Sequence, residues 1–335
     1  MRILILGGGA FVGRAITEAA TSAGHEVTTF TRSTVTPGAA DGRVEAVFGD
    51  RTEPGAFDFA LDRQWDAVFD TWMGAPRVVQ QGVAILRQHV PYYSFVSSCS
   101  VYQGDPQPFG LTEDSQTVDA DPAAELTNYS ADKRGAELAI LEGFGSGASF
   151  LARAGIILGP YENVGRLPWW LNRIALGGEV LAPGPHDLAL QYVDARDLAA
   201  WMLTCAERAT AGVFNAISTS GHTTMSELLE TCHVTTNSSA EFTWLPPEFV
   251  TEQGIAQWTE MPIWVSPDYY GMFSIETSRA AKAGLNCRPI TETVSDTWAW
   301  LQSEGQVQIP VGKSAPGLNA EKERSALNAW ASRFR

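Results

Sequence analysis

Short apolar runs alternate with amphipathic helical patterns through the first half of the chain. The first run, Ile3 to Leu6, precedes an alanine-rich helical pattern that continues to Ala20 and stops at Gly24. Strand signals separated by helical patterns recur at Glu26 to Thr31, Val44 to Phe48, Ala67 to Asp70, Ser94 to Ser97 and Phe150 to Ile157. This alternation predicts an α/β fold with a doubly wound parallel sheet, whose ligand lies beyond the carboxyl ends of the strands.

After Pro160 the alternation loosens. The segment from Leu190 to Thr204 and a strand at Val213 to Ala216 predict a return to the main sheet. Thr224 opens a capping box that begins another helix. The chain is then polar from residue 305 until a last helical pattern near Asn319 to Ser332.

Composition indicates a globular cytoplasmic protein. The 335 residues suffice for about two domains of ~150 residues, and 44% hydrophobic with 18% charged residues exclude general disorder. A net charge of −15 argues against binding to nucleic acid or an anionic membrane. The four cysteines form no CxxC pair, which indicates a reducing compartment. We recognise neither a secretory signal nor a membrane-crossing stretch.

A glycine-rich turn joins the first predicted strand to its helix. It runs over residues 7–13 as GGGAFVG, with G-x-x-A-x-x-G spacing. Such a turn presents backbone N–H groups and a helix N-terminus to a pyrophosphate, so we expect it to bind a dinucleotide. The residues concerned are Gly7, Ala10, Phe11, Val12 and Gly13. An ordinary tight turn is the plainer explanation, because a chain with 31 glycines contains accidental clusters.

The end of the second predicted strand bears on the type of dinucleotide. NAD sites usually place Asp or Glu there for the ribose 2′-hydroxyl, whereas NADP sites place a cation there for the 2′-phosphate. This strand ends in Thr31-Arg32, which predicts NADP(H) as the preferred cofactor and NAD(H) as the alternative, unless Arg32 is simply a solvated loop residue. Asp50 and Asp70-Thr71 end the next two strands and are placed either to touch adenine and ribose or to cap helices.

Tyr129 and Lys133 are candidates for proton transfer. They begin a helical stretch four residues apart, which places both side chains on one face. A cation beside a phenol lowers the phenol pKa from ~10 toward neutrality and makes it a usable acid or base. With four lysines and eight tyrosines, about 0.1 such pair is expected by chance, although a surface Tyr and Lys would give the same pattern.

A serine cluster follows the strand predicted at Ser94 to Ser97. At the carboxyl end of a strand, the hydroxyls of Ser98 and Ser100 can bond a substrate oxygen while Tyr129 transfers its proton, although a serine-rich turn is the simpler explanation. In an extended segment Cys99 points away from both serines, which predicts a packed structural thiol. The five histidines form no metal-ligand pair, and we expect no metal site.

Together these motifs resemble the extended short-chain dehydrogenase/reductase superfamily, which includes nucleotide-sugar epimerases and dehydratases. The resemblance covers most of the chain and rests on GGGAFVG at 7–13, FGD at 48–50, SSCSVY at 97–102, YSADK at 129–133, RAGIILGP at 153–160 and VDARDL at 193–198. It implies that Tyr129 is the acid/base, that Lys133 holds the nicotinamide ribose and tunes Tyr129, and that Ser98 orients the substrate.

The same resemblance implies cofactor contacts and marks two departures. Gly7 and Gly13 would face the pyrophosphate and Asp50 the adenine. Ala10 replaces the middle glycine of the family turn. The acid pair of the Thr-Asp-Glu-Val-Tyr motif of sugar dehydratases is absent before Tyr102, which disfavours dehydration.

The resemblance further implies a Rossmann-type NAD(P)-binding domain and a smaller C-terminal substrate-binding domain. The first comprises residues 1–160 and 190–220, the second 161–189 and 221–303, and a tail with a short helix occupies 304–335. Trp169 is a candidate substrate-binding residue because aromatic residues concentrate in the second domain. Arg166 and Arg173 are candidates for an anionic substrate group. Core packing and solvent exposure are the plain alternatives for these three residues.

Three functions are compatible with these observations. The first is a reductase-type NAD(P)-dependent oxidoreductase that transfers a hydride between nicotinamide and a carbonyl or alcohol of a small metabolite, such as one of secondary metabolism. The alternatives are a nucleotide-sugar epimerase with tightly bound NAD and a non-catalytic dinucleotide-binding protein. We expect a neutral, hydrophobic or aromatic substrate, because a nucleotide sugar needs well-placed groups to neutralise its diphosphate. The sequence leaves a homodimer open.

Overall fold

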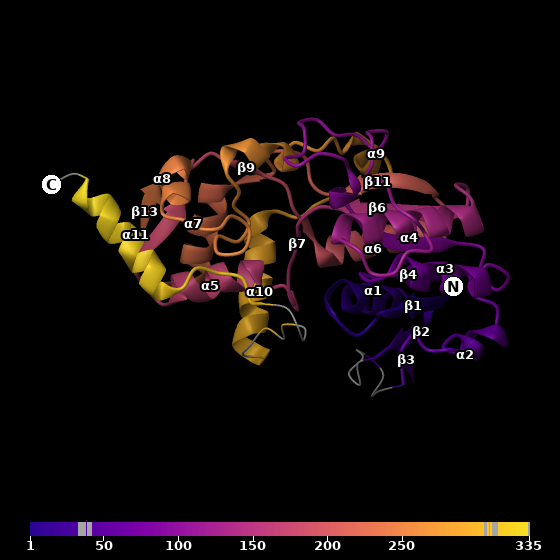
Figure 1. Ribbon diagram of the computed structural model, residues 1–335. Coiled ribbons are helices and arrows are strands. Elements are labelled where there is room, and N and C mark those ends of the chain that lie inside the picture. Colours follow the sequence, from indigo (N-terminus) through magenta and orange to yellow (C-terminus); the bar gives the residue numbers. More distant parts are fainter. Residues whose placement is uncertain (33–37, 39–41, 305–306, 308, 310–313, 334–335) are drawn as a thin grey trace.

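The computed structural model describes residues 1–335 except 33–37, 39–41, 305–306, 308, 310–313 and 334–335. Its larger part is built on a seven-stranded, fully parallel sheet with strand order β11-β6-β5-β4-β1-β2-β3 (Figure 1). The strands are β1 (Arg2–Leu6), β2 (Glu26–Thr31), β3 (Val44–Phe48), β4 (Ala67–Asp70), β5 (Tyr93–Ser98), β6 (Ser149–Ala154) and β11 (Gly212–Ala216). The predicted α/β fold with a doubly wound parallel sheet is confirmed.

Helices cover both faces of this sheet. Alternation in β1 directs Ile3 and Ile5 to one face and Leu4 and Leu6 to the other, and all four are buried. The first face is covered by α1 (Phe11–Ser22) and α6 (Ala195–Glu207). The second is covered by α2 (Asp58–Leu61), α3 (Pro76–Leu86) and α4 (Tyr129–Phe144). The carboxyl ends of the strands remain for a site, as the topology predicts.

A smaller region lies beside the sheet domain and has a core of its own (Figure 1). Its helices are α5 (Arg166–Ala175), α7 (Met225–Thr236), α8 (Pro247–Glu252), α10 (Ile290–Glu304) and α11 (Ala320–Ser332), with the 3-10 helix η2 (Pro267–Phe273). Strands β8 (Gly178–Pro183) and β13 (Ala240–Leu245) pair in parallel within it. Leu318, Ala326 and Leu327 join this core, so the helical part of the predicted tail packs on this region.

The crossing between the two regions departs from the prediction. The strand expected over 150–157 ends at Ala154, and a separate strand β7 (Ile157–Leu158) pairs with β10 (Val193–Asp194) outside the main sheet. At Gly155 the backbone approaches Ile217 so closely that a Cβ would lie 1.9 Å from its Cδ1 atom. A larger residue at this point would have to displace the end of the Ile217 side chain. The remaining short elements are η1 (Cys99–Val101), β9 (Ala189–Leu190), β12 (Thr223–Thr224) and α9 (Ser278–Lys282).

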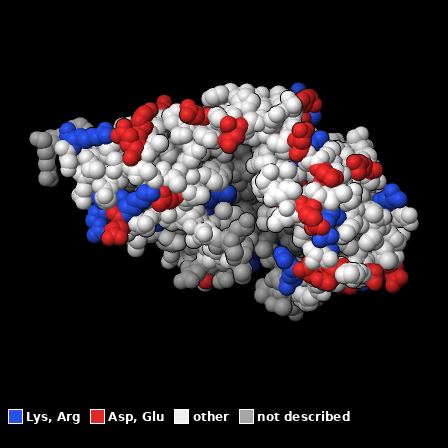
Figure 2. All heavy atoms as spheres, in the orientation of Figure 1, with Lys and Arg blue, Asp and Glu red and all other residues white. Residues whose placement is uncertain are grey.

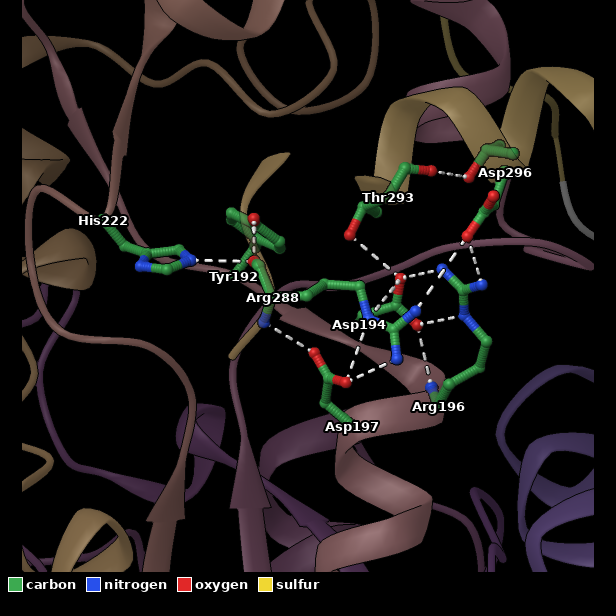
Figure 3. A network of polar contacts seen from close by, with 9 residues as sticks. Tyr192, Asp194, Arg196, Asp197, His222, Arg288, Thr293 and Asp296 are labelled. Carbon is green, nitrogen blue, oxygen red and sulfur yellow. Dashed lines mark hydrogen bonds and ion pairs between the residues drawn. The ribbon is translucent and has the colours of Figure 1, made fainter. Parts of the chain in front are cut away.

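The VDARDL motif forms a polar joint between the two regions (Figure 3). Asp194 is fully buried, caps α6 by accepting from the Arg196 amide at 2.9 Å, and accepts from the Thr293 hydroxyl of α10 at 2.9 Å. Arg288 donates to Asp197 at 2.6 and 2.9 Å. His222 lies 2.9 Å from the Arg288 carbonyl oxygen and thus belongs to this joint.

Acidic and basic side chains are interspersed over the visible face, and a hollow separates the two regions (Figure 2). Of the helices that the structure describes, none combines the length and apolar character needed to cross a membrane.

Candidate functional site

The glycine turn lies between β1 and α1 and fits a dinucleotide pyrophosphate. A Cβ at Gly13 would lie 1.9 Å from the carbonyl oxygen of Gly7, so only glycine lets the helix begin this close to the strand. Ala10 precedes the helix and has no side-chain oxygen to cap its first-turn amides. The side chains of Phe11 and Val12 are buried in the sheet domain, which leaves their backbone amides as the groups for phosphate.

Arg32 and Asp50 lie together at the carboxyl ends of β2 and β3. The Arg32 side chain is 73% exposed, and its guanidinium is 3.8 Å from the Asp50 carboxylate. Hydrogen bonds from the Thr52 amide and hydroxyl, with the charge of Arg32, lower the pKa of Asp50. Arg32 and Asp50, with Thr31 at the end of β2, stay candidates for the adenosine end of a dinucleotide.

Asp70 is occupied by protein groups, which contradicts its predicted contact with adenine or ribose. Its side chain is fully buried, and its two oxygens accept from Arg51 at 2.7 and 3.0 Å. The Tyr93 hydroxyl donates to the same carboxylate at 2.6 Å. The neighbouring Thr71 stays a candidate because it is only partly buried, with its hydroxyl 3.2 Å from the Leu6 carbonyl oxygen at the end of β1.

Lys133 points its ammonium at the carboxyl ends of β4 and β5. It is 2% exposed and donates to the carbonyl oxygens of Val96, at 2.7 Å, and Trp72. Burial lowers its pKa to about 7, although the charges of Asp70 and Glu137 act in the opposite direction. An ammonium has three N–H groups, so one is left for a ligand such as a ribose hydroxyl.

Tyr129 begins α4, is 48% exposed, and lies where this helix packs against the end of β5, close enough to Ser98 for that hydroxyl to lower its pKa. Partial desolvation of the phenol raises the Tyr129 pKa, and the Ser98 hydroxyl and the charge of Arg166 offset this only partly. The expectation that Lys133 lowers this pKa is therefore wrong: the net direction is upward, and the cation acting on the phenol is Arg166. Tyr129 is protonated at neutral pH in this environment.

Ser98 connects the strand to the turn that follows. Its hydroxyl accepts from the Ser100 amide at 3.1 Å and lies 3.1 Å from the Ser100 hydroxyl. Cys99 lies in η1 rather than in an extended segment, and its thiol contacts the Arg153 carbonyl oxygen. Burial raises the Cys99 pKa to about 12, which confirms a packed structural thiol. Within the described part of the chain, no three His, Cys, Asp or Glu side chains gather closely enough for a metal ion.

Glu162 is a buried carboxyl beside the candidate residue Arg166 that the sequence motifs did not predict. It is fully buried and accepts from the amides of Arg166, at 2.7 Å, and Leu167, at 3.2 Å, in the first turn of α5. The Arg166 guanidinium lies 4.7 Å from the ring centroid of Trp258 and acts electrostatically on Tyr129. The available signal was a carboxylate just before a helix start.

Trp169 and Arg173, candidates for binding the substrate, lie on the side of α5 that faces α11. Both side chains line a cleft of about 620 Å³ between α5 and α11, together with Leu176 and Leu327. Helical spacing places 169, 173 and 176 on one stripe that faces α11. Arg173 donates to Glu323 at 2.7 Å and is committed to this contact.

Replacing Ser98 should cost more activity than replacing Ser100. Ser98, and not Ser100, acts on the Tyr129 pKa, and one hydrogen bond to a developing oxyanion is worth ~3 kcal/mol, or about two orders of magnitude in kcat. We expect this loss for Ser98→Ala and a smaller loss for Ser100→Ala in steady-state kinetics. Equal losses in the two variants would show that the wrong serine has been assigned.

Glu162 should make stability depend on pH. Burial raises its pKa to about 7 from 4.5, so the folded state binds a proton that the unfolded state has released between these pH values. Stability contributed by the neutral carboxyl is lost as the pH rises through this window, by about 3 kcal/mol in total. In chemical denaturation, the free energy of unfolding of Glu162→Gln should rise relative to that of the parent protein by about 3 kcal/mol between pH 4.5 and 8. A difference independent of pH would contradict this.

Comparison with known proteins agrees with the geometry. Residues 3–83 and 78–216 match the NAD dependent epimerase/dehydratase family and together span more than half of the chain. No curated protein sequence matches it.

Solved structures similar to this chain share its fold. The Bordetella bronchiseptica enzyme WbmH in complex with NAD+ is 16% identical, covers 91% of this chain and 99% of its own, and has a TM-score of 0.68. The UDP-N-acetylglucosamine 4-epimerase of Methanobrevibacter ruminantium M1, in complex with UDP-N-acetylmuramic acid, is 17% identical, covers 90% of this chain and 98% of its own, and has a TM-score of 0.68. The UDP-glucose 4-epimerase of Thermotoga maritima, with UDP-glucose, is 17% identical, covers 91% of this chain and 100% of its own, and has a TM-score of 0.67. The resemblance seen in the sequence motifs is confirmed: this chain belongs to the NAD dependent epimerase/dehydratase family.

Proposed function

We propose that this chain interconverts an alcohol and a carbonyl on a small substrate, with Tyr129 as acid/base and Ser98 as the orienting hydroxyl. Lys133 would hold the nicotinamide ribose of the dinucleotide. The supporting observation is that α4, which begins at Tyr129, packs against the end of β5 and against η1, where Ser98 lies, at the same sheet edge as the glycine turn. The nicotinamide, when bound, would supply hydride transfer to and from the substrate carbon.

The protein groups divide the proton chemistry between them. Because its pKa is raised, Tyr129 carries its proton at neutral pH and donates it to the substrate oxygen as a carbonyl becomes an alcohol. In the reverse direction it takes that proton back, helped by Arg166 and Ser98, which both lower its pKa. The remaining N–H of Lys133 fixes the ligand beside them.

For the net reaction we favour epimerisation of a nucleotide sugar without net redox. The family match supports it, as do the two similar structures named as UDP-sugar 4-epimerases. Such an enzyme oxidises and then reduces the same carbon, and it therefore has to retain its dinucleotide between the two half-reactions.

Net oxidoreduction of a neutral substrate is the second candidate. It is supported by the small number of groups left to bind a diphosphate. Arg166 faces Tyr129, but Arg173 is bound to Glu323 at 2.7 Å. The Glu162 carboxylate accepts from two first-turn amides of α5, which removes them as diphosphate ligands. A neutral carbonyl or alcohol has no diphosphate to neutralise.

Cofactor retention and product analysis separate these candidates. The purified protein is denatured, the released dinucleotide is quantified, and the native protein is incubated with UDP-glucose and UDP-N-acetylglucosamine under NMR observation. Stoichiometric NAD and a C4 epimer without a change in cofactor absorbance support the epimerase. An absorbance change with added NADP(H) and aromatic ketones or alcohols supports the oxidoreductase. Dinucleotide binding without turnover of either class would support a non-catalytic dinucleotide-binding protein.

We propose separately that the chain prefers NADP(H) because Arg32 stands where NAD enzymes place an acid. Its guanidinium is exposed and only loosely paired with Asp50, so a 2′-phosphate would find a cation there. Arg32→Ala should weaken NADP(H) binding about tenfold in calorimetry and leave NAD(H) binding unchanged. Arg87→Ala, exposed at the far end of α3, is the control. Tighter binding of NAD(H) by the parent protein would overturn the preference.

A further inference from the structure

Asp70 lies at the centre of a buried polar cluster that links three strand ends. It ends β4, while its partners Arg51 and Tyr93 follow β3 and begin β5. Arg51 is 8% exposed and binds both carboxylate oxygens, and the Tyr93 hydroxyl donates at 2.6 Å. A carboxylate held by three charge-assisted hydrogen bonds has one orientation available.

This carboxylate also holds the backbone that receives Lys133. The Trp72 amide donates to Asp70 at 2.9 Å, and the Trp72 carbonyl oxygen accepts from the Lys133 ammonium. The indole of Trp72 donates to the Ala75 carbonyl oxygen at 3.0 Å, and its ring lies 4.9 Å from the Arg51 guanidinium carbon. The segment after β4 is therefore fixed on both sides of the carbonyl that Lys133 uses.

We propose that Asp70 is a positioning residue for Lys133, which it acts on through the Trp72 backbone and through its own negative charge. The proposal rests on the proposed function, because it matters to catalysis only if Lys133 holds the cofactor. It also gives Asp70 a role that replaces the cofactor contact expected from the sequence.

The charges that face Lys133 set the sign of each test. Asp70 and Glu137 favour the charged ammonium, whereas burial and the Arg51 cation disfavour it. Tyr129 lies one turn earlier on α4, and the Phe95 ring lies 4.6 Å from the ammonium without adding a charge. Removing the Asp70 charge should therefore lower the Lys133 pKa, and removing the Arg51 charge should raise it.

Lysine titration by NMR tests this directly, because the chain has only four lysines. Protein labelled with carbon-13 at lysine Cε is titrated, and Lys133→Arg assigns the resonance. We expect the Lys133 midpoint to fall by about one pH unit in Asp70→Asn and to rise by a similar amount in Arg51→Gln. Tyr93→Phe, which leaves both charges in place, should change it much less. NAD(P)(H) affinity of Asp70→Asn, relative to the parent protein, should then be about tenfold weaker at pH 8 and nearly equal at pH 6.

General loosening of the site predicts a different result. Water entering around Lys133 would raise its midpoint in both charge variants, so a rise in Asp70→Asn, or no change, overturns the proposal. If Asp70→Asn does not fold, the direction of the shift in Arg51→Gln decides. Failure of the proposed function is recognised separately. In that case Lys133→Ala would leave turnover and cofactor affinity unchanged, while Asp70→Asn and Arg51→Gln would still shift the Lys133 midpoint.

Discussion

Tyr129→Phe is expected to lower kcat by about 10³-fold while changing dinucleotide affinity less than about twofold. The variant keeps the ring at the start of α4 and removes only the hydroxyl, whose pKa Ser98 lowers. Because that hydroxyl is the proposed proton donor to the substrate oxygen, its loss acts on the chemical step. The cofactor contacts assigned to Lys133 and the glycine turn are untouched.

Two measurements make this prediction specific. Steady-state kinetics on the substrate identified by the product analysis give kcat, and calorimetry gives the dinucleotide affinity. Tyr92→Phe removes a hydroxyl bound to the Thr210 carbonyl oxygen, far along the chain from these groups, and serves as the control for loss of a phenol. A Tyr129→Phe enzyme that retains most of its kcat would falsify the assignment of the acid/base.

The elements that position the site were predictable because their signals are local. The bounds of β2, β3 and β4 agree with the predicted runs, since each apolar segment is flanked by turn or polar residues. The glycine turn and the one-face spacing of Tyr129 and Lys133 depend on residues at most six positions apart. These features can therefore be predicted from the spacing of residues within short segments of the sequence.

The partners of the polar side chains were not predictable, because strand ends distant in sequence bring them together. Asp70 meets Arg51 and Tyr93, which lie 19 and 23 positions away, so a carboxylate at a strand end was taken for a cofactor ligand. Lys133 uses the carbonyl of Trp72, 61 positions away, and backbone acceptors leave no trace in the sequence. The sign of the Tyr129 pKa shift followed burial, which spacing on a helix does not measure.

The largest loss of stability is expected where α4 is tied to the sheet by buried charges. Glu137 is fully buried and receives two hydrogen bonds from Arg153, both at 2.9 Å, and one from Ser97 at 2.7 Å. Arg134, one turn earlier on the helix, adds a contact at 2.8 Å. Burial alone would raise the Glu137 pKa, but the ion pair with Arg153 outweighs it and the pKa is lowered.

Glu137→Gln should lower the free energy of unfolding by ~3–5 kcal/mol, because it leaves the Arg153 cation buried without a counter-charge. Denaturant titration measures the loss. Arg134→Gln is the matched control: this partner is 20% exposed and water can replace it, so its loss should stay near ~1 kcal/mol. Replacing both charges in Glu137→Leu/Arg153→Met should cost less stability than Glu137→Gln alone, since no buried charge is then left unpaired.

The stability difference should also depend on pH. Because the Glu137 pKa is lowered in the folded state, the advantage of the parent protein over Glu137→Gln exists above pH ~4.5 and shrinks as the pH falls through the folded-state pKa. Equal losses for Glu137→Gln and Arg134→Gln would mean that the Arg153 pair does not anchor the helix that carries Tyr129 and Lys133.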